Sequence, residues 1–247
     1  GFVFENIIKF KTSKLYLNNF NIRPKPSKLN IPDWYKEISH NLKEKTIKGC
    51  MPFLDTLTIG YTLSMPIEYR IRHNIKVDNE RTSKAFAQLE AGSEIYHFTN
   101  VNTYNDESHP IGQLGMKCPF VQKNKTMEVH KILNPWIIET PPGYSCLFLP
   151  PLNNTDDRFS IIPGIVDTDV FPNEINFPFI VNGDKYPVLD TVIKEGTPYV
   201  QVIPFKRESW KMKIETISKS KNLRHSLWAR EVIHRYKNKF WNKKIWK

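Results

Sequence analysis

Histidine and carboxylate side chains are the first candidates for chemistry in this sequence, because together they can hold a metal ion. Residues 106–109 read Asp-Glu-Ser-His, which offers a carboxylate beside the imidazole of His109. His97 or His73 could supply a second imidazole, and two histidines with one carboxylate form the facial triad of non-haem iron enzymes. No HxH, HxD or HExxH motif fixes such a spacing, so a polar surface loop is the alternative interpretation of this stretch.

Cysteine chemistry and phosphate-binding loops are not indicated. Cys50, Cys118 and Cys146 lie far apart and form no CxxC pair, which excludes a four-cysteine zinc site and a disulfide framework and is typical of a reducing compartment. The sequence does not predict Cys50 or Cys118 in a nucleophile elbow or at a helix N-terminus that would activate it. The sequence has no P-loop and no GxGxxG motif, and it points to no particular cofactor.

The most informative stretch lies in the last third of the chain. Residues 162–169 read Ile-Pro-Gly-Ile-Val-Asp-Thr-Asp, residues 175–180 read Ile-Asn-Phe-Pro-Phe-Ile, and residues 193–201 read Ile-Lys-Glu-Gly-Thr-Pro-Tyr-Val-Gln. With the Pro-Gly-Tyr turn at 142–144, these motifs resemble the central part of the dUTPase/dCTP-deaminase superfamily over residues 141–205. The resemblance implies a β-clip core. It also implies that Asp167 lies in a uracil and sugar pocket, where it positions water, and that Gln201 matches the glutamine of an alanine–glutamine pair.

The sequence departs from that superfamily at several positions. Val170 stands where the superfamily has a tyrosine, and Val200 replaces the alanine before Gln201. An arginine–serine phosphate motif and a glycine-rich C-terminal arm are missing, although phosphate recognition needs donors of that kind. A nucleotide-processing enzyme and a non-enzymatic protein on the same fold therefore both remain hypotheses.

Longer stretches are similar to a protein family associated with tailed phages of marine and other bacteria. They are Lys-Gly-Cys-Met-Pro-Phe-Leu-Asp at 48–55, Asn-Pro-Trp-Ile-Ile-Glu-Thr-Pro-Pro-Gly-Tyr-Ser at 134–145 and Val-Ile-Pro-Phe-Lys-Arg-Glu at 202–208. The resemblance implies a phage protein of the host cytoplasm or the virion and implies no activity. No signal-peptide pattern opens the chain. No apolar run reaches the roughly 18 residues that span a bilayer, so neither secretion nor a membrane partner is expected.

The elements that must position these residues follow from short apolar runs. Runs at about ten-residue spacing predict the strands of a sandwich, barrel or β-clip; they are residues 136–139, 144–149, 159–162, 175–181 and 199–205. Upstream, residues 65–77 alternate between apolar and polar side chains, as a half-buried strand does. His73 falls on the apolar face, so we expect it to be buried and hydrogen-bonded. Pro32 and Asp33 suit the first turn of a short helix that reaches about residue 45.

The charge of the chain is concentrated at one end. Residues 206–247 hold 14 Lys and Arg against 3 Asp and Glu, whereas the preceding residues hold 22 of each sign. Residues 219–247 lack Pro and Gly, interleave aromatic with basic residues, and are predicted to be helical. Such an arm is typical of binding to nucleic acid or to an acidic protein, and the alternative is a helix packed on its own domain. The contacts expected of the arm come from Arg230, Arg235, Lys239, Trp241, Lys243 and Lys244.

Together these patterns predict a mainly β (α+β) protein in one compact unit. It comprises a β-rich elaboration with a short helix at 1–127, a β-clip-like core at 128–210 and a basic, aromatic-rich helical arm at 211–247. The function expected is a phage-encoded binding or assembly module, which could form a homo-oligomer. A dUTPase-like nucleotide-processing enzyme and a metal-dependent, oxygenase-like enzyme on a β scaffold are the alternatives.

Overall fold

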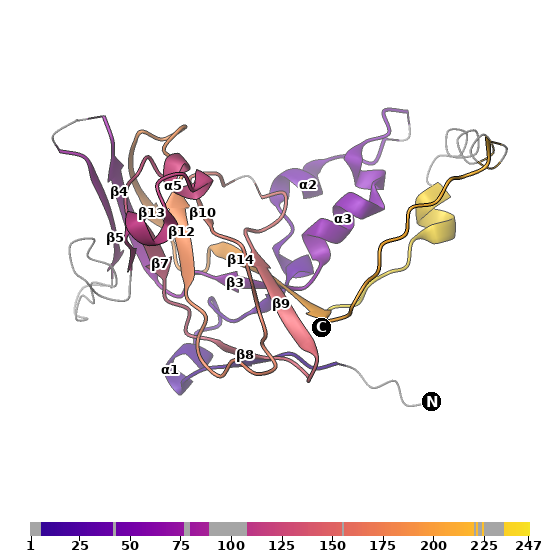
Figure 1. Cartoon of the computed structure of the whole chain (residues 1–247), viewed down its shortest axis with the longest axis horizontal. Coiled ribbons are helices and arrows are strands. Elements are labelled where there is room, and N and C mark those ends of the chain that lie inside the picture. The colour runs from indigo at the N-terminus through magenta and orange to yellow at the C-terminus, as the bar shows by residue number, and fades with distance from the viewer. Residues whose placement is uncertain are drawn as a thin grey trace.

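A computed structural model gives the structure of the chain and describes residues 6–41, 43–76, 80–88, 108–154, 156–219, 221, 224 and 235–247. Over these residues the fold is mainly β, as predicted, with short helices around the sheets (Figure 1). Within this part of the chain, no helix combines the length and the apolar character that a bilayer crossing needs.

The described strands pair antiparallel in four sheets. The five-stranded sheet has the order β11 (Gly164–Val166), β9 (Tyr144–Leu149), β14 (Pro198–Lys206), β3 (Tyr61–Ser64) and β2 (Lys25–Pro26). The four-stranded sheet has the order β10 (Phe159–Ile161), β12 (Phe177–Val181), β7 (Val129–Ile132) and β6 (Ser108–His109). The smaller sheets are β13 (Val188–Ile193), β4 (Glu68–Asn74) and β5 (Thr82–Gln88), and the pair β1 (Lys9–Lys11) and β8 (Ile137–Glu139).

The predicted apolar runs coincide with β8, β9, β10, β12 and β14 to within two residues at each end. Three strands of the predicted core, β7, β11 and β13, were not predicted. β7 is only four residues long, and its apolar residues are separated by His130 and Lys131. The other two differ from it in burial. Both are poorly buried, and β11 contains Gly164, so neither has the apolar run or the clean alternation from which strands are recognised.

The helices are shorter than predicted in one place and unpredicted in others. The helix expected from Asp33 to about residue 45 ends at Glu37, where Ile38 is extended. Farther on, the side chain of Asn41 accepts the N–H groups of Lys43 and Glu44 and favours a turn in place of helix. The short helices of the described residues are α1 (Lys14–Leu17), η1 (Ser27–Asn30), α2 (Asp33–Glu37), η2 (Ile47–Gly49), α3 (Met51–Thr58), α4 (Ile111–Leu114), α5 (Pro119–Lys123) and η3 (Tyr236–Phe240).

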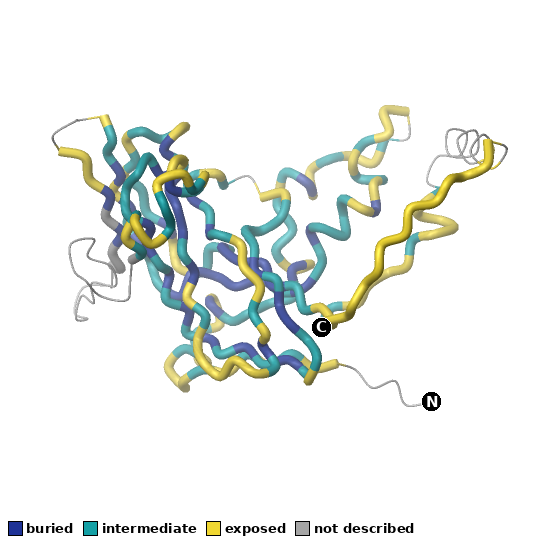
Figure 2. The backbone as a smooth tube through the Cα atoms, in the orientation of Figure 1, coloured by how far each residue is buried: buried dark blue, intermediate teal, exposed yellow. Residues whose placement is uncertain are grey.

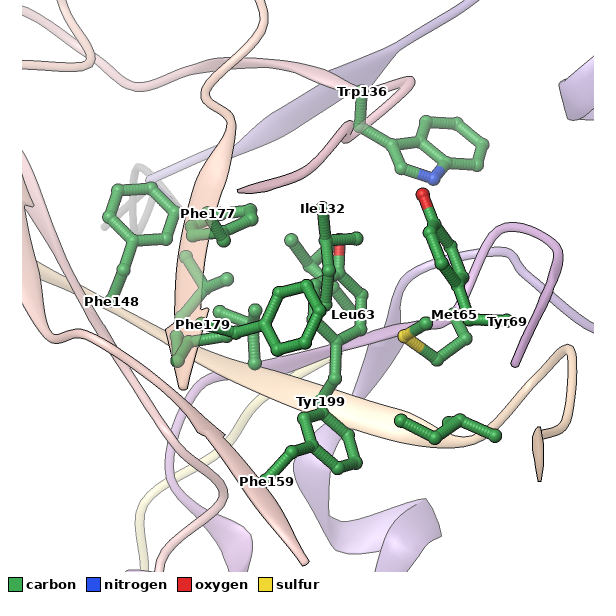
Figure 3. Packing of buried hydrophobic residues seen from close by; sticks show 14 of the residues in the cluster. Leu63, Met65, Tyr69, Ile132, Trp136, Phe148, Phe159, Phe177, Phe179 and Tyr199 are labelled. Carbon is green, nitrogen blue, oxygen red and sulfur yellow. The ribbon is translucent and has the colours of Figure 1, made fainter. Parts of the chain in front are cut away.

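Strands from both halves of the chain share one apolar core (Figure 3). The rings of Phe148 and Phe177 lie 5.4 Å apart, and Phe177 packs edge-on against Tyr199 at 5.8 Å. Leu63 from β3 and Tyr69 from β4 are buried in the same cluster. The segment expected to be an elaboration therefore supplies part of the same interior as the C-terminal strands.

His73 occupies the buried position that the alternation predicts. Its side chain is 1% exposed, and its Nδ1 lies 3.1 Å from Oγ of Ser83. Ser83 Oγ lies 3.0 Å from Nε2 of His130, so one hydroxyl joins two buried imidazoles. Burial lowers the pKa of both histidines to about 4. The charge of Arg81 adds to the effect on His73, and the charge of His73 adds to the effect on His130.

The buried pair makes the stability of the fold depend on pH. Because an unfolded histidine has a pKa near 6.5, the unfolded chain binds more protons than the folded chain between about pH 6.5 and pH 4. The stability that the two neutral histidines contribute is therefore fully present above about pH 6.5 and is lost as the pH falls towards about 4. We expect the free energy of unfolding, measured in urea, to decrease by about 2–4 kcal/mol from pH 7 to pH 5. His130→Gln should remove about half of this difference and His109→Gln none of it; equal differences in both variants would contradict the assignment.

Candidate functional site

Asp167 lies in a surface corner where two turns meet at the end of the five-stranded sheet. It directly follows β11, and its carbonyl oxygen accepts the N–H groups of Val170 and Phe171, which closes the turn. The second turn precedes β9 and contains Gly143 at φ +85°, a conformation that favours glycine. Pairing of β11 with β9 brings the two turns together.

Arg207 joins the two turns to the end of β14. Its guanidinium donates two hydrogen bonds to the Asp169 carboxylate, at 2.9 and 2.5 Å. Its backbone N–H donates to the carbonyl of Gly143 at 2.8 Å, and the N–H of Gly143 donates to Asp169 at 2.8 Å. These bonds, that from Arg207 first, lower the pKa of Asp169 to about 2. Asp169 is therefore a fixed anion that holds the corner.

Asp167 itself is open to solvent. Its side chain is 58% exposed, accepts a 2.6 Å hydrogen bond from Ser145 Oγ, and lies 3.5 Å from the Arg207 guanidinium. The hydroxyl and the cation fix the orientation of this carboxylate while leaving it accessible. The arrangement can hold a water molecule or a hydroxyl group of a ligand by hydrogen bonding.

Gln201 lies farther along the strands of the five-stranded sheet than Asp167. Its Oε1 accepts the N–H of Leu152 at 2.9 Å, and its Nε2 donates to the carbonyls of Thr56 and Ile59 at 3.0 and 2.8 Å. Gln201 faces Leu149 on β9, four residues along that strand from Ser145, or about 13 Å at 3.3 Å per residue. Within one chain, the structure does not bring Gln201 to Asp167.

A pocket lies under the turn before β9, and Asp167, Ser145 and Arg207 do not line it. Its lining combines the turn before β9 with the C-terminal residues and includes Thr140, Pro141, Tyr144, Pro204, Ile245 and Trp246. The indole nitrogen of Trp246 is buried and has no hydrogen-bond partner among the described residues. Asn6 donates to the Tyr144 hydroxyl at 2.9 Å on the same side. The pocket is mostly apolar, with few polar groups at its wall.

The basic arm, residues 206–247, leaves the body as two legs. Residues 207–218, the outgoing leg, are extended and exposed, and residues 241–247, the return leg, come back to the body (Figures 1 and 2). Between the legs, the described residues 219, 221, 224 and 235–240 are helical. The prediction of a helix from 219 to 247 was therefore wrong for the return leg, and the predicted helical arm also wrongly included residues 211–218.

Contacts with the body explain why the return leg is not helical. The Asp55 carboxylate, on α3, accepts Trp241 Nε1 at 3.1 Å and Lys244 Nζ at 2.6 Å. The ring of Trp246 packs edge-on against Tyr61 at 5.9 Å, and the Tyr61 hydroxyl donates to the carbonyl of Lys247 at 3.2 Å. An extended chain can reach both anchors.

The residues predicted to bind a partner have different surroundings where the structure describes them. Trp241 and Lys244 are engaged by Asp55, whereas Lys239 and Lys243 are exposed. The guanidinium of Arg235 lies 5.9 Å from the centre of the Phe240 ring. Arg230 lies outside the described residues.

The histidines proposed as metal ligands do not gather with carboxylates in the described part of the chain. Nδ1 of His109 lies 2.8 Å from Oε1 of Gln113, and His73 is paired through Ser83 with His130. Across the described ranges, no three His, Cys, Asp or Glu side chains gather in a way that could hold a metal ion. His97 lies outside those ranges.

Three residues at the corner were not found from the sequence. Arg207, Asp169 and Ser145 come from separate elements, and their partners lie 38 and 22 residues away in the chain. All three lie in stretches noted for a resemblance, Ser145 in 134–145, Asp169 in 162–169 and Arg207 in 202–208, but nothing in those stretches indicated that the three side chains meet.

Comparisons with known proteins were made for the whole chain. No protein-family model and no curated protein matches it. Among solved structures, the chain is similar to a mutant dUTPase of Staphylococcus bacteriophage 80alpha with dUpNHpp. Sequence identity is 12%, the TM-score is 0.37, and the match covers 87% of this chain and 94% of that chain. A likeness this distant assigns no function, which has to come from the residues of the site.

Substitutions of Gln201 and of Asp167 should have different effects on the free energy of unfolding. Gln201→Ala leaves two buried carbonyls and one N–H without partners, so we expect a loss of about 2–4 kcal/mol in the free energy of unfolding. Asp167→Asn alters an exposed side chain and should change it by less than about 0.5 kcal/mol. Urea unfolding of both variants checks this. Equal stability of Gln201→Ala and the natural chain would contradict the structural role of Gln201.

Proposed function

We propose that this chain is a phage-encoded binding module without catalytic activity, whose basic arm binds nucleic acid through its phosphates. The observation that carries the proposal is the position of the charge. The body is neutral, and the excess of 11 positive charges belongs to a segment that projects away from the sheets (Figure 1). A field confined to one extended element favours contact with a polyanion along that element.

Much of the arm's charge is not neutralised within the chain. Carboxylates pair with Lys206, Arg207, Lys213 and Lys244. In contrast, the side chains of Lys211, Lys237, Lys239 and Lys243 make no ion pair among the described residues and stand on exposed positions of the arm. These lysines are available to phosphates without first breaking a contact.

Aromatic rings accompany the free cations. Trp210 is 87% exposed, Phe240 is 61% exposed and Tyr236 is 48% exposed. Exposed rings between cations suit single-stranded nucleic acid, because bases stack on aromatic faces without regard to sequence. Trp241, one of the contacts predicted for the arm, is held by Asp55, so Trp210 and Phe240 are the better candidates for stacking on bases.

The salt dependence of binding tests this proposal. Each phosphate contact releases counterions, so for about four to seven contacts with a single strand the slope of log affinity against log salt should lie between about −3 and −5. Fluorescence anisotropy with a labelled single-stranded DNA, at about 50–200 mM NaCl, measures this slope. Lys237→Gln/Lys239→Gln should flatten the slope by about 1–2.

A matched control separates the arm from charge in general. Lys28→Gln/Lys43→Gln removes the same charge from exposed positions of the body and should leave affinity and slope unchanged. An equal effect of both pairs, or no binding at low salt, would reject the arm as a nucleic-acid site. Binding of an acidic protein in place of DNA would identify the competing partner class.

A nucleotide-processing enzyme is the second candidate, favoured by the exposed Asp167 carboxylate, which Ser145 and Arg207 hold in a fixed orientation. A ligand that binds only the folded chain raises the melting temperature. If this candidate is right, deoxyuridine nucleotides should raise the melting temperature of the natural chain and not that of Asp167→Asn. If the nucleotides change the melting temperature of both proteins equally, Asp167 does not bind them, and the binding module remains the proposed function.

A further inference from the structure

The outgoing leg carries an apolar row that its own chain does not cover. Trp210, Met212 and Ile214 alternate with Lys211 and Lys213 along an extended backbone, as on a β-strand. The three apolar side chains are 87%, 83% and 85% exposed. No strand pairs with this leg among the described residues. Large apolar side chains in a row, beside unpaired backbone groups, are typical of a strand that adds to the sheet of another molecule.

The same chain offers an acceptor for such a strand. β11 is an edge of the five-stranded sheet and, in the described structure, pairs only with β9. Ile165 at its centre is 62% exposed, and Val170 and Phe171 in the following turn are 72% and 40% exposed. An unprotected edge with apolar side chains is a site for strand pairing between molecules.

The charges of the leg and of this edge are complementary. Between Phe159 and Gly183, the segment that contains β11 has three carboxylates, Asp167, Asp169 and Glu174, and no Lys or Arg. Arg207 already neutralises Asp169, so the acidic charge open to a partner comes from Asp167 and Glu174. The leg and its flanks are strongly basic, so two legs repel each other, whereas a leg and this edge attract. Complementary charge of this kind selects the partner and its orientation more than it adds affinity.

We propose that the outgoing leg of one copy pairs as an added strand with β11 of a second copy of this chain. Its apolar row would then cover Ile165, Val170 and Phe171. The donor and acceptor surfaces differ, so the contact is head-to-tail, and each copy gives one leg and receives another. Such contacts close into a ring when the angle between copies allows it. The proposal rests on the apolar row and not on the lysines of Tyr236–Phe240. It shares only Trp210 with the proposed nucleic-acid surface, so variants of Met212 and Ile214 test it separately.

Size-exclusion chromatography with light scattering on the full chain tests the association. The natural chain should be oligomeric at tens of micromolar, a concentration at which most specific interfaces are populated. Met212→Asp/Ile214→Asp and, separately, Ile165→Asp should each raise the concentration for half-association about tenfold or more. Val188→Asp at an exposed position of β13 is the matched control and should associate like the natural chain. Lys211→Gln/Lys213→Gln removes cations that attract the acidic edge and should weaken association less than the apolar variants do.

Mixing the two disrupted variants gives the sharper test. Ile165→Asp keeps an intact leg, and Met212→Asp/Ile214→Asp keeps an intact β11, so the mixture should form heterodimers that neither variant forms alone. A monomeric natural chain, or a mixture that stays monomeric, would overturn the proposal. Association that is lost equally in the Val188→Asp control would overturn it too. Lys237→Gln/Lys239→Gln should associate normally even where it fails to bind DNA, which separates this proposal from the proposed function.

Discussion

The pairing of Arg207 with Asp169 is the interaction on which the arrangement of body and arm depends. The guanidinium also donates to Ser145 and to the carbonyl of Tyr144, and the backbone of Arg207 is bonded to Gly143. One residue therefore ties the end of β14 to the turn before β9 and the turn after β11. Without this tie, neither the position of Asp167 nor the direction in which the outgoing leg departs would be fixed.

The second constraint is the separation of charge between body and arm. A neutral body can form an ordinary apolar core. The basic segment stays outside it, because the desolvation free energy of an unpaired cation is larger than the free energy gained by burying the apolar part of its side chain. The arm is held at two points, by Asp169 at its start and by Asp55 near its end. Between those points, the exposed apolar and aromatic side chains remain available to a partner.

The sequence predicted the parts of the fold that depend on local pattern. The apolar runs located five strands, and the alternation through residues 65–77 placed His73 inside, where it is joined to Ser83. Local pattern could not give the contacts between distant residues. Asp55 meets Lys244 across 189 positions, and Arg207 meets Asp169 across 38, and no periodicity records such pairs. Gln201 was assigned to a site by resemblance alone, whereas its buried amide binds three backbone groups of α3 and the neighbouring loops.

Hydrogen exchange measured by mass spectrometry, on the dilute full chain with and without a single-stranded DNA, tests the central claim most directly. The claim is that a stable β body presents a separate basic arm as its binding element. It predicts slow exchange in β9, β12 and β14, fast exchange in residues 208–218, and protection by DNA confined to residues 206–247. Protection by DNA at the Asp167 corner instead of the arm, or slow exchange of the outgoing leg in the dilute free chain, would contradict it.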